Sequence, residues 1–257
     1  MSQLKPTKTM IPTYLASLLS LLTYSLPISA LAQSPTRLVD PQLGPIQTAV
    51  KFSPPPDTER PEGETASSRR GGCFEKNKKD LPLTGVVPPK KIGLTVAAHP
   101  TFFLYVPQTK DQAVEFILQD ENDREIYKTN FRMNDNAGII SISLPDTANL
   151  PPLEVGKNYR WYFSLICDVE SSDGNIFIDG WVRRVEPSLA LKNQLEKAAP
   201  RDRADIYAAA GIWQETLASL AELRRSRPND SALASEWANL LRSVGLNEIA
   251  EEPLAPL

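Results

Sequence analysis

The fold is constrained most by seven short β-type segments between residues 81 and 185, and apolar and polar side chains alternate most clearly over 113–119 and 159–167. Such alternation, broken by turn residues, is typical of strands in an antiparallel sheet that is buried on one face. The expected strands are Gly93–Ala97, Thr101–Val106, Ala113–Gln119, Glu125–Arg132, Ile139–Leu144, Tyr159–Cys167 and Ile176–Val185. Seven strands in this length predict an antiparallel β-sandwich over residues 73–187.

Residues 188–257 instead show the apolar spacing of amphipathic helices. Gly211 and Gly245 lie 34 residues apart, which is the period of tetratricopeptide repeats. Aligning them places Ala204 and Ala238 at the same small-residue position of a first helix. We expect one complete tetratricopeptide-like unit and a truncated second one. Because so few repeats rarely stand alone, the helices should pack against the sandwich, which makes the fold class α+β.

The first 32 residues predict secretion. Lys5 and Lys8 precede an apolar run over Ile11–Ile28, and Ala30 and Ala32 supply the small residues that a signal peptidase reads. We expect cleavage after residue 32 and a mature protein in the periplasm or outside the cell. No second apolar stretch of membrane length follows, so no membrane span is expected in the mature protein.

Residues 33–72 hold many prolines, among them Pro54-Pro55-Pro56, and lack apolar periodicity. A segment of this composition cannot bury enough surface to offset its ordering entropy. We expect an extended, mobile linker between the signal peptide and the sandwich.

The two cysteines of the chain, Cys73 and Cys167, both lie in the expected mature region. In an oxidising compartment such a pair favours a disulfide. The bridge would close a 94-residue loop and stabilise the fold by about 4–5 kcal/mol in the chain-entropy account. Two free thiols or a redox pair are the alternatives, although a redox pair usually shows a Cys-x-x-Cys motif, which the sequence lacks.

Residues with catalytic chemistry are sparse. The chain has one histidine, His99, and no Gly-x-Ser-x-Gly sequence, so no nucleophilic site is evident. The net charge of −3 becomes about −5 without the two lysines of the signal peptide, which argues against nucleic-acid binding. The oxygen-rich loop Asp168–Asn175 departs from the spacing of known Ca²⁺ loops, so calcium binding there stays open. We expect no cofactor and no enzymatic activity.

Two groups of residues are candidates for binding. Arg224, Arg225 and Arg227, with the neighbourhood of Trp237, form a candidate contact surface for a protein partner. The arginines also suit the C-terminal end of a helix, and Trp237 fits a helix-packing position, so a structural role is the alternative. Strand aromatics can stack on sugar rings or fill a core. These aromatics are Tyr105, Tyr127, Tyr162, Phe177 and Trp181.

The order of motifs along the chain carries a family resemblance. The motifs are Gly71-Gly72-Cys73, Pro100–Pro107, Leu153–Ser164, Gly180–Val185, Tyr207–Trp213 and Gly245-Leu246. Within them, Leu153–Trp161 resembles the L-x-x-G-x-x-Y-x-W segment of fibronectin III-like sandwiches. Over about residues 71–257 the chain resembles the domain of unknown function 928 family, secreted or periplasmic proteins known mainly from cyanobacteria. The resemblance implies a compartment and a layout but no activity.

Three functions remain open. The favoured one is a non-enzymatic adaptor or scaffold of the cell envelope that binds an envelope or secreted protein, because a linker and repeat-like helices occur without a catalytic motif. The second is a glycan-binding sandwich for exopolysaccharide or peptidoglycan. The least favoured is a polysaccharide hydrolase, which would need two carboxylates in one cleft.

Overall fold

The computed structural model describes residues 50–61, 81–108, 113–133, 137–147, 149–167 and 175–256. Within these ranges the strands come first and four α-helices follow, so the fold is α+β as predicted. The strands are β1 (Thr84–Gly85), β2 (Gly93–Thr95), β3 (Thr101–Val106), β4 (Ala113–Gln119), β5 (Glu125–Arg132), β6 (Gly138–Ser143), β7 (Asn158–Ile166) and β8 (Ile176–Arg184). The helices are α1 (Leu189–Lys197), the 3₁₀ helix η2 (Pro200–Asp202), α2 (Arg203–Ala209), α3 (Trp213–Ser226) and α4 (Ser231–Ser243). In this part of the chain, no helix has the length and apolar character needed to cross a membrane.

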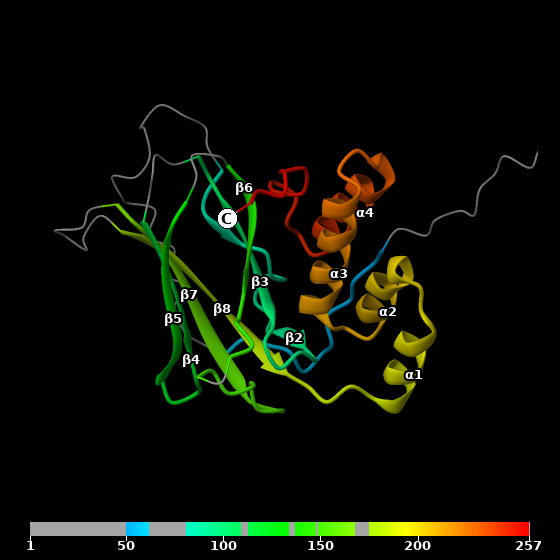
Figure 1. Ribbon diagram of the computed structural model, residues 1–257, viewed down its shortest axis with the longest axis horizontal. Helices are drawn as coiled ribbons and strands as arrows, with labels where there is room; N and C mark the ends of the chain where they lie inside the picture. The colour runs from blue at the N-terminus through cyan, green and yellow to red at the C-terminus, as the bar shows by residue number, and fades with distance from the viewer. Residues whose placement is uncertain are drawn as a thin grey trace, which may run out of the picture. The chain divides into compact units, whose positions relative to one another are not determined.

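The strands form two sheets (Figure 1). The smaller has the order β1-β3-β6 and is antiparallel, and the larger has the order β2-β8-β7-β4-β5. All seven expected strands are present, with ends that shift by two residues or fewer. The expected all-antiparallel arrangement is wrong at one place, because β2 pairs parallel with β8. Alternation of side chains reports which face is buried, and it says nothing about the direction of the neighbouring strand.

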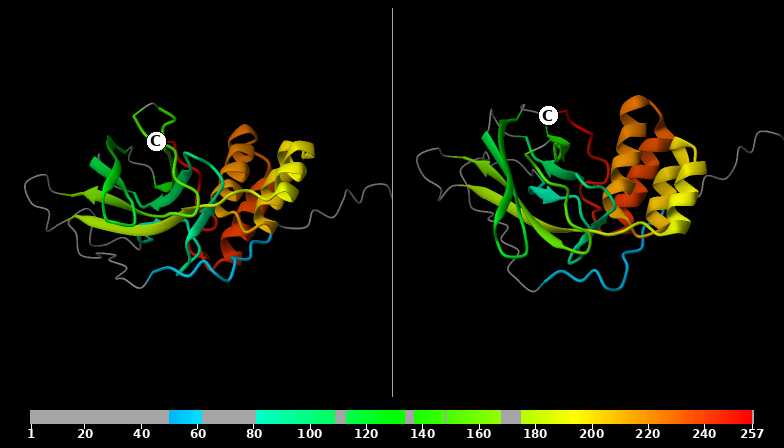
Figure 2. Two further views of the ribbon diagram at one scale, coloured as in Figure 1. Left: turned by 90° about the horizontal axis from the view of Figure 1, so that it is seen from below. Right: turned by 60° about the horizontal axis from the view of Figure 1, so that its bottom comes forward.

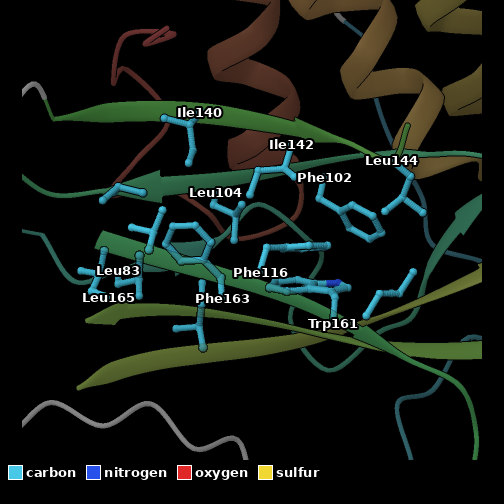
Figure 3. Close-up of a cluster of buried hydrophobic side chains, with 14 of the residues drawn as sticks. Leu83, Phe102, Leu104, Phe116, Ile140, Ile142, Leu144, Trp161, Phe163 and Leu165 are labelled. Atoms are coloured by element: carbon cyan, nitrogen blue, oxygen red, sulfur yellow. The ribbon is translucent and has the colours of Figure 1, made fainter. Parts of the chain in front are cut away.

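The facing sides of the two sheets share one hydrophobic cluster (Figure 3). Every second residue of β4 and β7 is buried there, as the alternation predicts. Trp161 of β7 lies near Phe102 of β3, with ring centroids 6.1 Å apart. The labelled members of this cluster are Leu83, Phe102, Leu104, Phe116, Ile140, Ile142, Leu144, Trp161, Phe163 and Leu165.

The smaller sheet is buried on its other face as well. Phe103 and Tyr105 of β3 and Ile139 of β6 belong to a second cluster, together with Trp213 of α3 and Trp237 of α4. This explains why β3 reads as an unbroken apolar run rather than as an alternating one. The helices therefore lie against the smaller sheet, on the side away from β5 (Figures 1 and 2).

The aligned repeat positions have matching local structure. Gly211 follows α2 with a φ of +72°, and Gly245 follows α4 with a φ of +86°, values that glycine adopts without strain. Ala204 and Ala238, seven residues before each glycine, are both buried. Both glycines thus end a helix at an equivalent place in the chain.

Residues 50–61 were expected to belong to the mobile linker, and here the expectation is wrong. Val50 and Phe52 are buried in the cluster beneath the helices, and the Phe52 ring lies 4.7 Å from that of Trp213. Further along, the carbonyl of Thr58 accepts a hydrogen bond of 2.8 Å from the Ile92 amide. Val50 and Phe52, just before the proline run, bury enough apolar surface to order the segment. The rest of the expected linker, 33–49 and 62–72, lies outside the described residues.

Replacing Phe52 by alanine tests this anchoring. Loss of its buried ring and of its contact with Trp213 is expected to lower the free energy of unfolding by about 3 kcal/mol, the lower end of the cost for a buried phenylalanine. Urea unfolding followed by tryptophan fluorescence measures the change. A substitution at the exposed Lys51 serves as the control. If residues 50–61 were a mobile linker, both variants would unfold like the wild type.

Candidate functional site

The candidate site is a groove beside β6, where the chain's last described residues meet the smaller sheet. The amide of Ile139 donates to the Pro253 carbonyl at 2.7 Å, and the amide of Ala255 donates to the Ile139 carbonyl at 2.9 Å. Leu254 thereby forms a single parallel bridge with Ile139. The segment 253–256, which we name the C-terminal segment, thus lies along the edge of β6.

A glycine permits this close approach. A Cβ atom at Gly138 would lie 2.8 Å from the Pro253 carbonyl oxygen and 2.9 Å from the Ala255 Cβ. The residue also has a φ of +155°, which side chains disfavour. A larger residue at position 138 would collide with the C-terminal segment, so the glycine lets this segment lie close to the sheet.

The groove has a volume of about 380 Å³. Its lining combines one cation, one hydroxyl and an apolar wall from the C-terminal segment. Arg225 of α3 donates a hydrogen bond of 2.8 Å to Ser141 Oγ of β6, which fixes the guanidinium beside the strand. The lining residues are Ser141, Arg225, Leu254, Ala255 and Pro256. Sheet, helix and C-terminal segment thus each contribute one wall.

The four residues predicted as a partner surface do not share one exposed surface. Only Arg225 lines the groove. Arg227 is exposed beyond the end of α3 and pairs with Asp230 at 3.5 Å. Trp237 is fully buried, with its ring 6.1 Å from that of Phe103, so its assignment to a contact surface is wrong. A tryptophan at a helix-packing position buries its large apolar area against the sheet instead.

Arg224 lies between the core and the surface. Its guanidinium carbon is 5.3 Å from the centroid of the Trp237 ring, a cation–π contact. Burial lowers its pKa, and one of its terminal nitrogens is buried without a hydrogen-bond partner. Within the described ranges no carboxylate forms an ion pair with Arg224 or Arg225. The C-terminal turn of α3 thus presents two neighbouring guanidiniums that pair with no carboxylate of the residues described.

Residues 64–254 match the family described as Domain of Unknown Function (DUF928). The chain belongs to this family. The match confirms the resemblance read from the motifs, and it covers both sheets, the helices and part of the C-terminal segment. Among curated proteins none matches the chain.

The outer face of the larger sheet of this DUF928 protein carries the second candidate surface. Tyr162, Phe177 and Trp181 all lie there, half-buried. However, the Arg160 guanidinium lies 4.9 Å from the centre of the Tyr162 ring and 5.7 Å from that of Trp181. Asp179 holds Arg160 in place at 2.9 Å. Two of the three rings are therefore partly covered by the protein's own side chain.

The other two aromatics of the glycan hypothesis lie elsewhere. Tyr105 is buried between the smaller sheet and the helices, and Tyr127 packs against the cluster between the sheets. The five aromatics thus do not form one exposed face. Alternation along a single strand cannot show that the far face of a sheet is covered by helices.

The described residues of this DUF928 chain include only part of the other predicted features. Cys167 follows β7 and packs against the cluster between the sheets, but Cys73 lies outside the described residues, so the disulfide stays a prediction. The signal peptide and all of the calcium-loop candidate except Asn175 also lie outside them. His99 donates from Nε2 to the Leu150 carbonyl at 3.1 Å, a contact between two loops.

Sequence reasoning missed Ser141 and the C-terminal segment. Ser141 stands in an apolar strand, and only the fold brings it to Arg225, 84 residues later in the chain. One signal was present. Pro253 and Pro256 flank two apolar residues, a pattern typical of an extended segment that packs on a surface.

A partly buried carboxylate anchors the helices to the larger sheet. Glu215, in the first turn of α3, accepts hydrogen bonds from the Thr95 hydroxyl at 2.6 Å and from the amides of Val96 at 3.3 Å and Ala97 at 3.0 Å. Burial raises its pKa above the ordinary value despite these donors. Sequence periodicity does not reveal this contact, because it joins residues about 120 positions apart.

The raised pKa of Glu215 predicts a pH dependence of stability. Its contribution is full below the unfolded-state pKa of 4.5 and is lost as the pH rises through the higher folded-state pKa. The free energy of unfolding of the wild type, minus that of Glu215→Gln, should therefore fall as the pH rises above 4.5. Urea unfolding at several pH values gives this difference. A difference that stays constant would contradict a raised folded-state pKa.

Proposed function

We propose that this DUF928 protein is a secreted, non-enzymatic interaction module of the cell envelope that binds a protein partner in the groove beside β6. One observation supports the proposal above the others. The groove combines a sheet edge with an arginine that has no carboxylate partner in the described part of the chain. Sheet edges and unpaired guanidiniums are common means of holding extended peptides.

The layout is consistent with such a module. We interpret the two packed sheets as a fibronectin III-like sandwich and the region α2–α4 as tetratricopeptide-like, on the matching positions of Gly211 and Gly245. Both kinds of domain commonly act as binding scaffolds. The predicted signal peptide suits a module that acts outside the cytoplasm.

The experiment is affinity capture from the envelope fraction of the native cells, using residues 33–257 with brief crosslinking and mass spectrometry. The test variant is Arg225→Glu, which reverses the charge in the groove. The control is Arg203→Glu, because Arg203 is exposed at the start of α2 and does not line the groove. Point variants are preferable to deleting the helices, which would expose Phe103 and Tyr105.

The outcomes separate the proposals. A partner retained by the wild type and by Arg203→Glu, but lost by Arg225→Glu, supports the groove. A partner that all three proteins retain would contradict it.

Polysaccharide captured without protein would instead favour the glycan-binding alternative. The half-buried Phe177 and Trp181 on the outer face support that alternative. It predicts that Trp181→Ala weakens polysaccharide retention, whereas Arg225→Glu does not.

A further inference from the structure

We propose that the partner's segment is an extended acidic peptide that adds to the open edge of β6 and places a carboxylate against Arg225. This inference rests on the proposed function and specifies its ligand. It predicts that the peptide's main chain pairs with Ser141 and Ser143 and that its carboxylate contacts the Arg225 side chain. Each part follows from a separate observation.

The direction of the backbone groups in β6 identifies the open edge. In a strand, successive residues direct their N–H and C=O groups to opposite sides. Ile139 directs both groups toward the C-terminal segment, away from β3. Ser141 and Ser143, two and four residues later, therefore direct theirs to the same side. Within the described residues, neither has a backbone partner there.

The C-terminal segment demonstrates that this edge accepts an extended chain. It pairs with Ile139 through two hydrogen bonds and runs parallel to β6. The next hydrogen bond of such a parallel ladder would join the Ser141 amide to the Ala255 carbonyl, and the described residues do not form it. The ladder therefore stops beside the groove, although β6 continues to Ser143.

The charge of the groove specifies an acidic ligand. Arg225 faces the groove, and the neighbouring Arg224 is half-buried on Trp237 with a buried nitrogen that lacks a partner. A guanidinium removed from water is stabilised when a carboxylate accepts its hydrogen bonds. The chain as a whole is acidic, with a net charge of −3, so two adjacent guanidiniums that lack a counter-ion among the described residues are a local exception. A ligand with Asp or Glu in an extended stretch fits both the edge and the charge.

Selection from a phage-displayed library of random heptapeptides tests the inference. The bait is the mature chain, residues 33–257, and each selected peptide is then synthesised and titrated against the variants. The proposal predicts that bound peptides are rich in strand-forming residues and share an Asp or Glu. Their affinity should fall at least tenfold with Arg225→Glu and stay unchanged with Arg203→Glu. A Lys in place of the shared acid should restore binding to Arg225→Glu.

A second variant tests the main-chain pairing. Ser143→Pro removes an N–H that faces the open edge, so the pairing of β6 with β3 is retained. Circular dichroism and the unfolding midpoint verify that the variant is folded. The proposal predicts that peptide binding is lost, and equal binding by the folded variant would overturn strand addition.

The other outcomes show whether the acidic-peptide inference or the proposed function has failed. Selected peptides without a shared acid, or no selected peptides at all, would overturn the acidic-strand inference. The proposed function would still stand if envelope capture yields a partner that Arg225→Glu loses. If capture fails while acidic heptapeptides bind as predicted, the groove is a peptide site and the envelope assignment is wrong.

Discussion

Replacing Trp213 by alanine is expected to lower the free energy of unfolding by about 4 kcal/mol, the middle of the range for a buried aromatic residue. Trp213 is fully buried at the start of α3. Its indole N–H donates to the Val86 carbonyl at 2.8 Å, and its ring contacts Phe52. One side chain thus joins the helices, the loop after β1 and the segment 50–61. The substitution leaves a cavity and an unpaired carbonyl at their junction.

Urea unfolding measures the change, and Trp213→Phe is the matched variant because it keeps most of the ring but loses the hydrogen bond. We expect its loss of stability to be smaller, about 1–2 kcal/mol. If helices and sheets unfolded independently, Trp213→Ala would instead split the transition into two. A single, shifted transition is the expected result, because the second hydrophobic cluster spans both parts.

The second large effect is expected from Gly180→Ala. A Cβ atom at Gly180 would lie 2.2 Å from Cζ2 and 2.5 Å from Cε2 of Trp161, far inside van der Waals contact. Trp161 is itself 2% exposed, so its indole has little room to move. Overpacking in the core between the sheets is expected to cost about 3 kcal/mol.

Gly156→Ala is the control for this variant. Gly156 has a φ of +84° but nothing within 4 Å of the added Cβ, so backbone strain alone should cost about 1 kcal/mol. Thermal and urea unfolding of both variants give the comparison. Equal losses for the two would contradict the close approach of Trp161 to β8.

The sequence predicts the strands well because burial on one face leaves a period-two pattern. In β4, Val114, Phe116 and Leu118 are all buried, and the residues between them are not. The pattern fails to report pairing direction, so the parallel contact of β2 with β8 could not be predicted. It also fails for β3, where both faces are covered and no alternation remains.

The candidate site was predictable only in part. The sequence predicts that Arg225 lies in the last turn of a helix. Its contact with Ser141 depends on how that helix lies on the sheet. Trp237 has the spacing of a core residue, together with Leu233 and Leu241, so its burial agrees with the helical pattern. The two prolines of the C-terminal segment indicate an extended chain, but they do not indicate that it forms a backbone bridge to Ile139.

Hydrogen exchange of the β6 amides tests the central claim most directly, with the protein partner that envelope capture identifies as the ligand. In the free protein, the amides of Ser141 and Ser143 should exchange faster than those of Ile140 and Ile142, which face β3. The account predicts that the bound partner slows exchange at Ser141 and Ser143. Slowed exchange confined to β7 and β8, with β6 unchanged, would contradict it.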